Sequence, residues 1–212
     1  MPKKTKTRED KNVREQRMRA RIKSAAFKLM AEKGIENVSM REIAEKVKVT
    51  KPVLYYYFKD KEDLCSSIIA QHTEHFSQFL QKALSTDLSA AELLGEIFER
   101  HLEFFQKDTR NSKFIAQVMS HALNTKLRRF SPKTQEEALN GALACLAEKG
   151  EIPQKGKMDL ECLVRAVFLQ IMLSAYIRQH ASVQMPYEYD NSSVNRLAKI
   201  LVLGIREYYK PR

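Results

Sequence analysis

The stretch from Val47 to Phe58, V-K-V-T-K-P-V-L-Y-Y-Y-F, constrains this chain more than any other part of it. Thr50 can cap a helix N-terminus, and Pro52 then falls in the first helical turn, where the amide proton that proline lacks would have no partner. We therefore expect a turn followed by a short helix, the second half of a helix-turn-helix. Its side chains combine a charge, methyl groups and phenols that suit DNA groove edges and phosphates: Lys51, Val53, Tyr55 and Tyr56.

Helical signals continue on both sides of this stretch. Ser39 with Glu42, and Ser89 with Glu92, form S-x-x-E capping boxes ahead of apolar residues spaced three and four apart. Only 6 glycines and 6 prolines occur in 212 residues, and no strand-like alternation is visible. We expect an all-α protein of about nine helices. Among the expected boundaries are a first helix from about Arg14, a sixth from about Ser112, a seventh from Ser131-Pro132 and an eighth capped by Asp159.

The net charge of +11 is distributed unevenly. Residues 1–61 hold 18 lysines and arginines against 8 acidic residues, a net charge of +10, whereas residues 62–212 hold 19 against 18, a net charge of +1. A basic segment joined to an almost neutral body is typical of a polyanion-binding module attached to a second domain. For residues 1–11 alone, a solubilising tail is the alternative interpretation.

Three widely spaced cysteines, Cys65, Cys145 and Cys162, form no C-x-x-C pair and favour a reduced, cytoplasmic setting. The basic N-terminus is not followed by an apolar segment, so no export signal is predicted. The most apolar stretch, from Leu163 to Ile177, is interrupted by Arg165 and Gln170, and we expect it to be too short to span a bilayer. We expect a soluble protein without membrane association.

The last two expected helices are apolar on more than one face. One body cannot bury both faces of such helices, so we infer that the pair packs inward and also against a second copy, as a four-helix bundle across a two-fold axis. A fully internal hairpin in a larger monomer is the alternative. The residues expected at the homodimer interface are Ala166, Leu169, Leu173, Ile177, Leu197, Ile200, Leu201 and Ile205.

The run from Ser39 to Leu64, S-M-R-E-I-A-E-K-V-K-V-T-K-P-V-L-Y-Y-Y-F-K-D-K-E-D-L, resembles the signature of the TetR family of bacterial transcriptional regulators. The resemblance covers about a quarter of the chain closely, and the helical remainder agrees with the family in layout only. One departure concerns the turn. Lys48 stands where the family usually has glycine, so this turn is expected to be strained or differently shaped.

The resemblance implies roles for individual residues. Arg41 matches a position that reaches a base edge in some members, although an exposed surface charge is an equal alternative. Lys61 matches a lysine that touches phosphate at the start of the fourth helix. Ser39 and Thr50 are expected to act first as helix caps. The full set of expected DNA-binding residues is Ser39, Arg41, Thr50, Lys51, Pro52, Val53, Tyr55, Tyr56 and Lys61.

The remaining chain is expected, by the same resemblance, to bind an effector and to dimerise. The division would be a flexible basic arm at 1–13, a helix-turn-helix domain at 14–60 and a helical regulatory domain at 61–212. An apolar or aromatic small molecule is the expected effector, with ordinary core packing as the alternative for each candidate residue. The candidates are Phe104, Phe105, Phe114, Met119, Phe168, Met172 and Tyr176.

The function expected is a repressor that a small molecule releases from operator DNA. The alternative is a DNA-binding protein of the same fold that a protein partner controls, or that organises DNA. No glycine-rich phosphate loop, G-x-S-x-G or H-E-x-x-H motif occurs, so no enzyme is predicted. His72 and His75 are spaced like possible metal ligands, but exposed histidines explain them better, and neither a metal nor a cofactor is expected.

Overall fold

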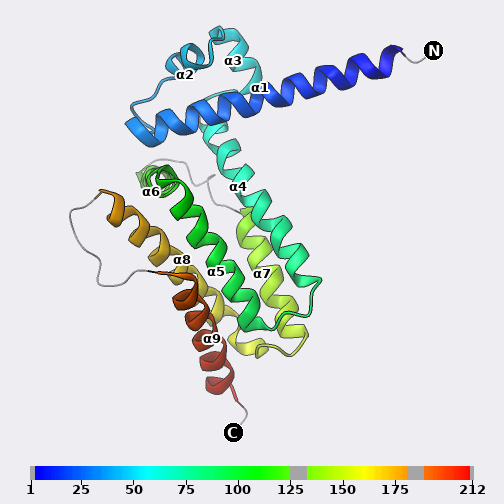
Figure 1. Cartoon of the computed structure of the whole chain (residues 1–212), viewed down its shortest axis with the longest axis vertical. Coiled ribbons are helices and arrows are strands. Elements are labelled where there is room, and N and C mark those ends of the chain that lie inside the picture. The colour runs from blue at the N-terminus through cyan, green and yellow to red at the C-terminus, as the bar shows by residue number, and fades with distance from the viewer. Residues whose placement is uncertain (1–2, 125–132, 181–188, 211–212) are drawn as a thin grey trace. The chain divides into compact units, whose positions relative to one another are not determined.

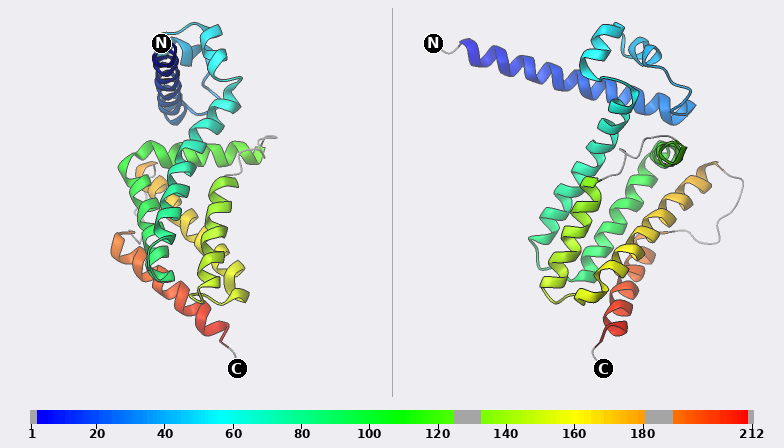
Figure 2. Two further views of the ribbon diagram at one scale, coloured as in Figure 1. Left: turned by 90° about the vertical axis from the view of Figure 1, so that its right-hand side faces the viewer. Right: turned by 180° about the vertical axis from the view of Figure 1, so that it is seen from behind.

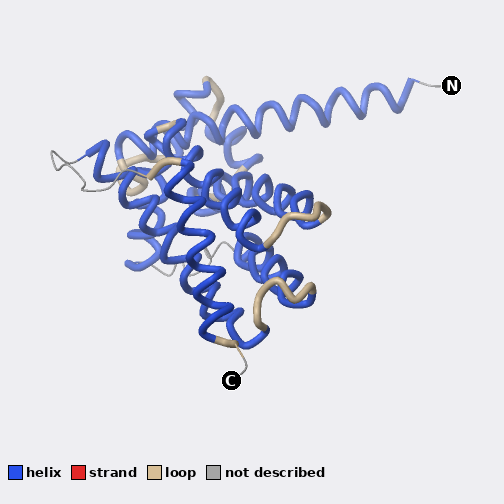
Figure 3. Tube along the Cα trace, turned by 60° about the horizontal axis from the view of Figure 1, so that its bottom comes forward, coloured by secondary structure: helices blue, strands red, loops and turns tan. Residues whose placement is uncertain are grey.

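The computed structural model describes residues 3–124, 133–180 and 189–210. Every regular element in these ranges is a helix (Figure 3). This confirms the predicted all-α fold. The elements are α1 (Lys3–Lys33), α2 (Met40–Val47), α3 (Lys51–Tyr57), α4 (Lys61–Leu84), α5 (Ala90–Lys107), α6 (Thr109–Asn124), α7 (Lys133–Glu148), the 3₁₀-helix η2 (Gln154–Gly156), α8 (Lys157–His180) and α9 (Asn191–Tyr208) (Figure 1).

The chain forms two compact units. Unit 1 comprises Met1–Gln71 with Gln117–Phe130, and unit 2 comprises His72–Ala116 with Ser131–Arg212. The helix α4 begins in unit 1 and ends in unit 2. The boundary that we predicted at residue 61 falls at the start of this helix, whereas the observed division falls within it, between Gln71 and His72.

In unit 1, α2 contacts both α1 and α3 (Figure 2). Its apolar residues recur at helical spacing and are buried, because only one face of so short a helix can meet α1 and α3. The ring of Phe58, which directly follows α3, is also buried. The fully buried large side chains of this unit are Ile22, Met30, Ile43, Leu54, Phe58 and Leu64.

The helix α1 is longer than the sequence led us to expect. It begins at Lys3, so residues 3–13 are helical where we predicted a flexible arm. No glycine or proline occurs between Lys3 and Lys33, and nothing in this segment interrupts the helical hydrogen bonds. The helix ends at Gly34, whose φ of 94° suits the left-handed stop that only glycine adopts without cost.

In unit 2, α5 is the central helix and packs against both α8 and α9, while α7 packs against α8. The capping box of Ser89 and Glu92 forms as predicted at the start of α5. Gly95 lets α5 and α9 approach closely, because a Cβ atom there would lie 2.1 Å from Asn195 Oδ1. The core of this unit includes Leu80, Leu93, Ile97, Phe98, Leu143, Leu160, Val164, Val194 and Val202.

Two predicted helix starts in this part were wrong. The helix α8 begins at Lys157, so Asp159 lies in its first turn instead of capping it, and its Oδ2 accepts a 2.6 Å hydrogen bond from the Tyr209 hydroxyl. The helix α6 begins at Thr109, before Ser112. The predicted start of α7 at Ser131-Pro132 lies outside the described residues.

The exposed side of α8 is unusually apolar. Residues Gln154–Arg178 form a stretch long and apolar enough to cross a membrane by length and composition, with a mean hydropathy of 1.7. Our expectation concerned only the shorter stretch from Leu163 to Ile177, and it stays a prediction. Only 28% of the apolar window in Gln154–Arg178 is buried, because its inward side chains such as Leu160 and Ile171 join the core while its outward side chains do not. One face of α8 thus remains uncovered in the protomer.

Candidate functional site

The turn between α2 and α3 is built from backbone hydrogen bonds around a left-handed residue. Lys48 has φ 59° and ψ 48°, the conformation that the family's glycine would favour. Its amide donates to the carbonyl of Glu45 at 3.1 Å, and the Val49 amide donates to that of Ala44 at 3.0 Å. The lysine therefore adopts the conformation that the turn requires, and the turn keeps its shape.

The helix caps on the two sides of this turn differ. The Ser39 hydroxyl accepts a 3.2 Å hydrogen bond from the Glu42 amide, as its predicted capping role requires. The Glu42 carboxylate pairs with Lys33 of α1. Thr50 is the N-cap residue of α3, but its side chain makes no capping hydrogen bond, so the predicted hydroxyl cap was wrong. The Thr50 hydroxyl is an exposed group beside the N-terminus of α3.

The helix α3 divides sharply into a buried and an exposed side. Leu54 is 0% exposed and Phe58, just after the helix, is 1% exposed, so these two residues anchor α3 in unit 1. Val53 and Tyr56 are 40% and 67% exposed. The outward side of α3 carries five of the residues that we predicted to bind DNA: Lys51, Pro52, Val53, Tyr55 and Tyr56.

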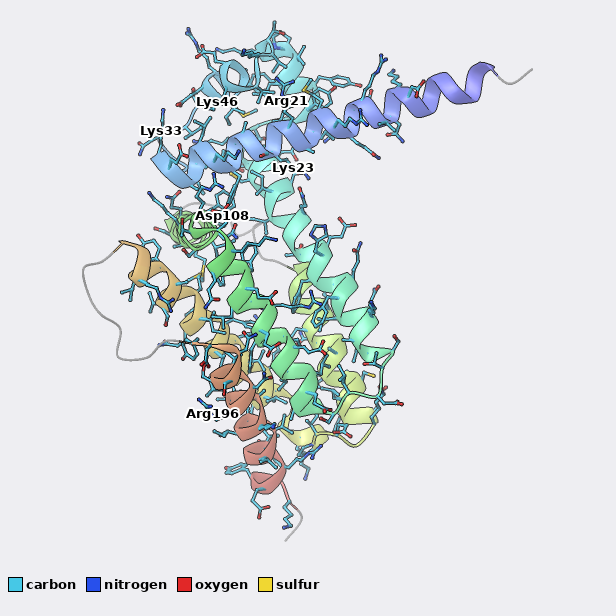
Figure 4. The ribbon with its side chains drawn as sticks, in the orientation of Figure 1. Arg21, Lys23, Lys33, Lys46, Asp108 and Arg196 are labelled. Carbon is cyan, nitrogen blue, oxygen red and sulfur yellow. The ribbon has the colours of Figure 1, made fainter. Side chains whose placement is uncertain are left out.

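Three α1 side chains that the sequence analysis missed hold α2 and α3 in place. Arg21 reaches from α1 toward α2 and donates a 2.6 Å hydrogen bond to the Val47 carbonyl (Figure 4). The Arg19 guanidinium lies 5.4 Å from the ring centroid of Phe58, a cation–π contact. Glu15 accepts a 3.2 Å hydrogen bond from the Tyr56 hydroxyl. The charge of the two arginines suggested only DNA attraction, and nothing in the local sequence marks the partners of these three residues.

Arg41 and Lys61 are engaged within unit 1. The Arg41 Nε donates to Glu45 at 2.8 Å in an exposed ion pair one helical turn apart. The Lys61 ammonium donates to the carbonyl oxygens of Ile35 at 2.8 Å and Val38 at 3.2 Å. Lys61 therefore fastens the α1–α2 loop to the start of α4. Its phosphate contact stays a prediction, whereas this positioning role is directly visible.

The effector candidates do not all lie together. Phe104, Phe168 and Met172 pack, half-buried, against the core of unit 2, and Phe105 belongs to that core. Phe114 is 1% exposed, and Tyr176 is half-buried. Met119 is 41% exposed and belongs to unit 1, whereas the other candidates belong to unit 2.

The aromatic residues of unit 2 surround a histidine that the sequence analysis did not select. The ring of His101 stacks on Phe168 with centroids 4.0 Å apart, and the edge contact with Phe76 measures 4.9 Å. His101 Nδ1 donates to the Ile97 carbonyl at 2.8 Å. Burial lowers the pKa of His101 to about 4, so its imidazole is neutral at pH 7. Also on α8, the buried Ser174 Oγ has no hydrogen-bond partner among the described residues.

The expected dimer residues lie mostly on the uncovered face. Leu169, Leu173 and Ile200 are 51%, 43% and 63% exposed. Ile205 is only 6% exposed and lies in the core of unit 2, so it does not belong to this face. Leu203, which is 62% exposed, lies on the outer side of α9 instead. Ala166 is exposed as well, while Ile177, Leu197 and Leu201 are half-buried.

Among the described side chains, no group of three histidine, cysteine or acidic residues is arranged to hold a metal ion. His75 is exposed, and the side chain of His72 lies outside the described part. The Cys65 thiol, buried against Met30 Sδ at 3.5 Å, has its pKa raised to about 12 by burial. Cys65 is therefore a protonated core residue at neutral pH.

The helix-turn-helix of unit 1, with its exposed α3, defines the class of helix-turn-helix DNA-binding proteins. The family model described as "Bacterial regulatory proteins, tetR family" matches residues 22–68. An HTH-type transcriptional regulator of Staphylococcus aureus strain USA300 is 26% identical over 166 residues, which cover 78% of this chain and 86% of that relative.

Solved structures share the fold over most of the chain. FadR from Bacillus subtilis, in complex with stearoyl-CoA, superposes with a TM-score of 0.73 at 21% identity, covering 88% of this chain and 98% of FadR. A TetR-family regulator from Mesorhizobium loti gives a TM-score of 0.67 at 20% identity over 92% and 98% of the two chains. Residues 22–68 match the TetR family of bacterial transcriptional regulators, as their signature predicted, and most of the chain shares the fold of these solved structures.

Proposed function

We propose that this TetR-family regulator is a homodimeric repressor that reads an operator with α3 and leaves it when a small apolar molecule binds in unit 2. The observation that carries the proposal is the division of α3, where Leu54 is buried and its neighbours Val53 and Tyr55 are exposed. Exposed apolar and phenolic side chains on a short, firmly anchored helix suit the floor of a major groove.

Within this proposal the contacts divide into two kinds. Lys51, Pro52 and Val53 lie at the N-terminal tip of α3, the end that enters the groove in helix-turn-helix proteins, and read base edges and thymine methyl groups. Tyr55, the Thr50 hydroxyl and the Ser39 end of α2 contact phosphates and fix the register. Arg41 must leave Glu45 to reach a base, which is feasible because that pair is exposed.

The uncovered face of α8 and α9 supports the homodimer. Large apolar side chains at more than 40% exposure on both helices, such as Leu169 and Leu203, leave an apolar surface that water disfavours. A second copy offers the same surface, and the two pairs of helices would bury one another across a two-fold axis. Covering by a copy of itself also accounts for the membrane-like hydropathy of α8 in a chain that acts on cytoplasmic DNA.

The aromatic cluster around His101 supports an effector of low charge. The cluster consists of aromatic rings and a neutral imidazole, and α8 also carries the buried Ser174 hydroxyl, which lacks a partner among the described residues. An acyl or aromatic molecule with one polar group matches these surroundings better than a charged one. FadR, which shares the fold, binds stearoyl-CoA.

Release would follow from a population shift. The recognition helices of a dimer must lie about 34 to 36 Å apart to enter successive major grooves. An effector can bind more tightly to a dimer whose recognition helices have a different spacing. It then weakens operator binding by at most the ratio of its affinities for that dimer and for the DNA-binding dimer. The helix α4, continuous from Lys61 in unit 1 to Leu84 in unit 2, is the element through which the change would pass.

Operator binding by variants of α3 tests the proposal. We expect Lys51→Ala and Val53→Ala each to weaken binding to the operator by about 1 to 3 kcal/mol, with little change on unrelated duplexes, because each removes a base contact. Fluorescence anisotropy with both duplexes measures this ratio. Lys82→Ala, at an exposed position of α4 in unit 2, is the control and should change neither affinity. Equal losses on both duplexes would contradict base reading by α3.

A further inference from the structure

The first half of α1 lies outside the part of the chain that the family model matches. The match begins at Ile22, whereas α1 begins at Lys3. The intervening turns extend beyond α2 and α3 as a projecting helix (Figure 1). Packing within the protomer does not explain which residues occupy the outer turns of this helix, so their composition points to a contact with another molecule.

Most of the positive charge of the DNA-reading end is in this extension. Residues 1–21 hold nine lysines and arginines against three acidic residues, a net charge of +6. Residues 22–68, which match the family model, hold nine against seven, a net charge of +2. The electrostatic attraction to a polyanion therefore originates mainly from the extension and not from the helix-turn-helix itself.

At least three of the nine cations of the matched domain are already engaged within unit 1. Lys33 pairs with Glu42, Arg41 pairs with Glu45, and Lys61 is bound to backbone carbonyls. On the extension, Lys11, Arg14 and Arg17 are exposed, and none of them forms an ion pair among the described residues. Cations without internal partners are the ones that can bind phosphate oxygens.

A hydrogen bond fixes where the extension lies relative to α3. Glu15 of α1 accepts from the Tyr56 hydroxyl, so this turn of α1 is adjacent to the exposed side of the recognition helix. Lys11 is four residues earlier, and helical periodicity places position 8 on the same side. From Glu15 back to Lys3 the helix measures about 18 Å. It can therefore reach several phosphates beyond those that α3 meets.

We propose that residues 3–21 of α1 form a second DNA-binding element, a basic helix that binds the phosphate backbone of duplex DNA next to the sequence read by α3. It supplies affinity that does not depend on sequence, whereas α3 supplies the specificity. The inference rests on the proposed operator-binding function of unit 1.

The composition of the extension favours DNA over an anionic membrane. A helix that lies in a membrane interface needs an apolar face to insert between the lipids. Between Lys3 and Arg17 the only large apolar residue is Val13, while threonine, asparagine, glutamine and charged residues occupy the other positions. No apolar face exists on these turns, and a duplex needs none.

The test compares the full-length protein with the variant Lys11→Gln, Arg14→Gln, Arg17→Gln on an operator and on an unrelated duplex across a salt series. We expect the variant to bind both duplexes at least about tenfold more weakly at 0.1 M salt, with an unchanged ratio between them. The slope of log K against log salt should fall by up to about 3, because each lost phosphate contact contributes about 0.9.

Two matched variants control for general effects. Lys82→Gln, Lys107→Gln, Lys155→Gln removes the same charge from exposed positions of unit 2 and should leave the salt slope unchanged. Lys11→Arg, Arg14→Lys, Arg17→Lys keeps the charge on the extension and should bind like the wild type. Far-UV circular dichroism checks that α1 remains helical in each.

The outcomes separate this inference from the function on which it rests. Wild-type protein that binds no duplex at low salt overturns both. Wild-type protein that binds the operator, together with an extension variant whose salt slope and affinity are unchanged, overturns the second element alone. Binding of wild-type protein to vesicles of anionic phospholipid, lost in the extension variant while DNA binding stays intact, also overturns it.

Discussion

Lys61 combines a phosphate contact predicted from the family signature with hydrogen bonds that hold the α1–α2 loop. Its ammonium donates to two carbonyl oxygens of the loop between α1 and α2, within 3.2 Å of each. We expect Lys61→Met to lower the free energy of unfolding by about 2 kcal/mol, because hydrogen bonds from a charged group contribute about 1.5 to 3 kcal/mol. Urea unfolding measures this change.

Lys59→Met is the matched control, since Lys59 is exposed and only its backbone amide, not its side chain, forms a hydrogen bond among the described residues. It should change stability little. If Lys61→Met unfolds like the wild type while its DNA affinity falls, the carbonyl contacts are dispensable and the phosphate role inferred from the signature is the main one.

Lys48 carries the strain of the turn. A residue with a Cβ atom at φ 59° is about 1 to 2 kcal/mol less stable than it would be in a right-handed conformation, and glycine avoids this cost. After the greater chain entropy of glycine in the unfolded state is counted, Lys48→Gly should stabilise the protein by about 0.5 to 1 kcal/mol. The midpoint of thermal unfolding should rise accordingly.

The same substitution two residues earlier is the control. Lys46→Gly places glycine inside α2, where it should destabilise the protein by about 1 kcal/mol. A Lys48→Gly variant that is destabilised like Lys46→Gly would show that the left-handed conformation is not a source of strain.

At the scale of elements, the sequence predicts those starts and stops that a local signal specifies. The capping serines Ser39 and Ser89 and the stop at Gly34 are such signals, and the structure has helices there. The early start of α1 was missed because charged residues were interpreted as disorder, although no residue there breaks a helix. The partners of Arg21 and Lys61, 26 and 23 residues away, depend on packing that no local pattern encodes.

The interior of unit 2 was the least predictable part for the same reason. Helical spacing identified apolar residues, but it could not separate Phe105, which is core, from Phe168, which stacks on His101. Burial in three dimensions decides between these roles. A histidine on an apolar face gives no warning in the sequence of how far its pKa will move.

The packing of α5 against α8 has a measurable pH dependence through His101. Its pKa of about 4 in the folded state is below the unfolded value of about 6.5, so the unfolded state binds the proton more readily. Stability is therefore fully present above about pH 7 and is lost as the pH falls toward 4. At pH 5 the expected loss is about 2 kcal/mol relative to pH 8.

His101→Phe removes this ionisable group and keeps an aromatic ring against Phe168. Urea unfolding of both proteins at pH 5 and pH 8 tests the assignment. The difference in unfolding free energy between the two pH values should be about 2 kcal/mol smaller in the variant. An equal pH dependence would show that other groups cause the loss.

At the scale of the whole molecule, the uncovered apolar face of α8 and α9 and the exposed side of α3 belong to one proposal. A single short recognition helix contacts too few base pairs for strong specificity, and pairing two copies multiplies its contacts. In the proposed function the exposed side of α3 reads DNA, and the proposed dimer makes this reading effective. Leu203 and Leu169, both more than half exposed, are the residues whose burial the dimer requires.

The most direct measurement of this central claim is the mass and affinity of the complex with DNA from the protein's own upstream region, by analytical ultracentrifugation with labelled duplex. We predict two protomers per site for the wild type. Leu169→Glu, Leu203→Glu should be a folded monomer with at least tenfold weaker operator binding, because a charge in the apolar face prevents pairing. Met119→Glu, at a position of unit 1 that is 41% exposed, should remain dimeric. A wild-type monomer on the duplex, or a double variant that binds as tightly as the wild type, would contradict the account.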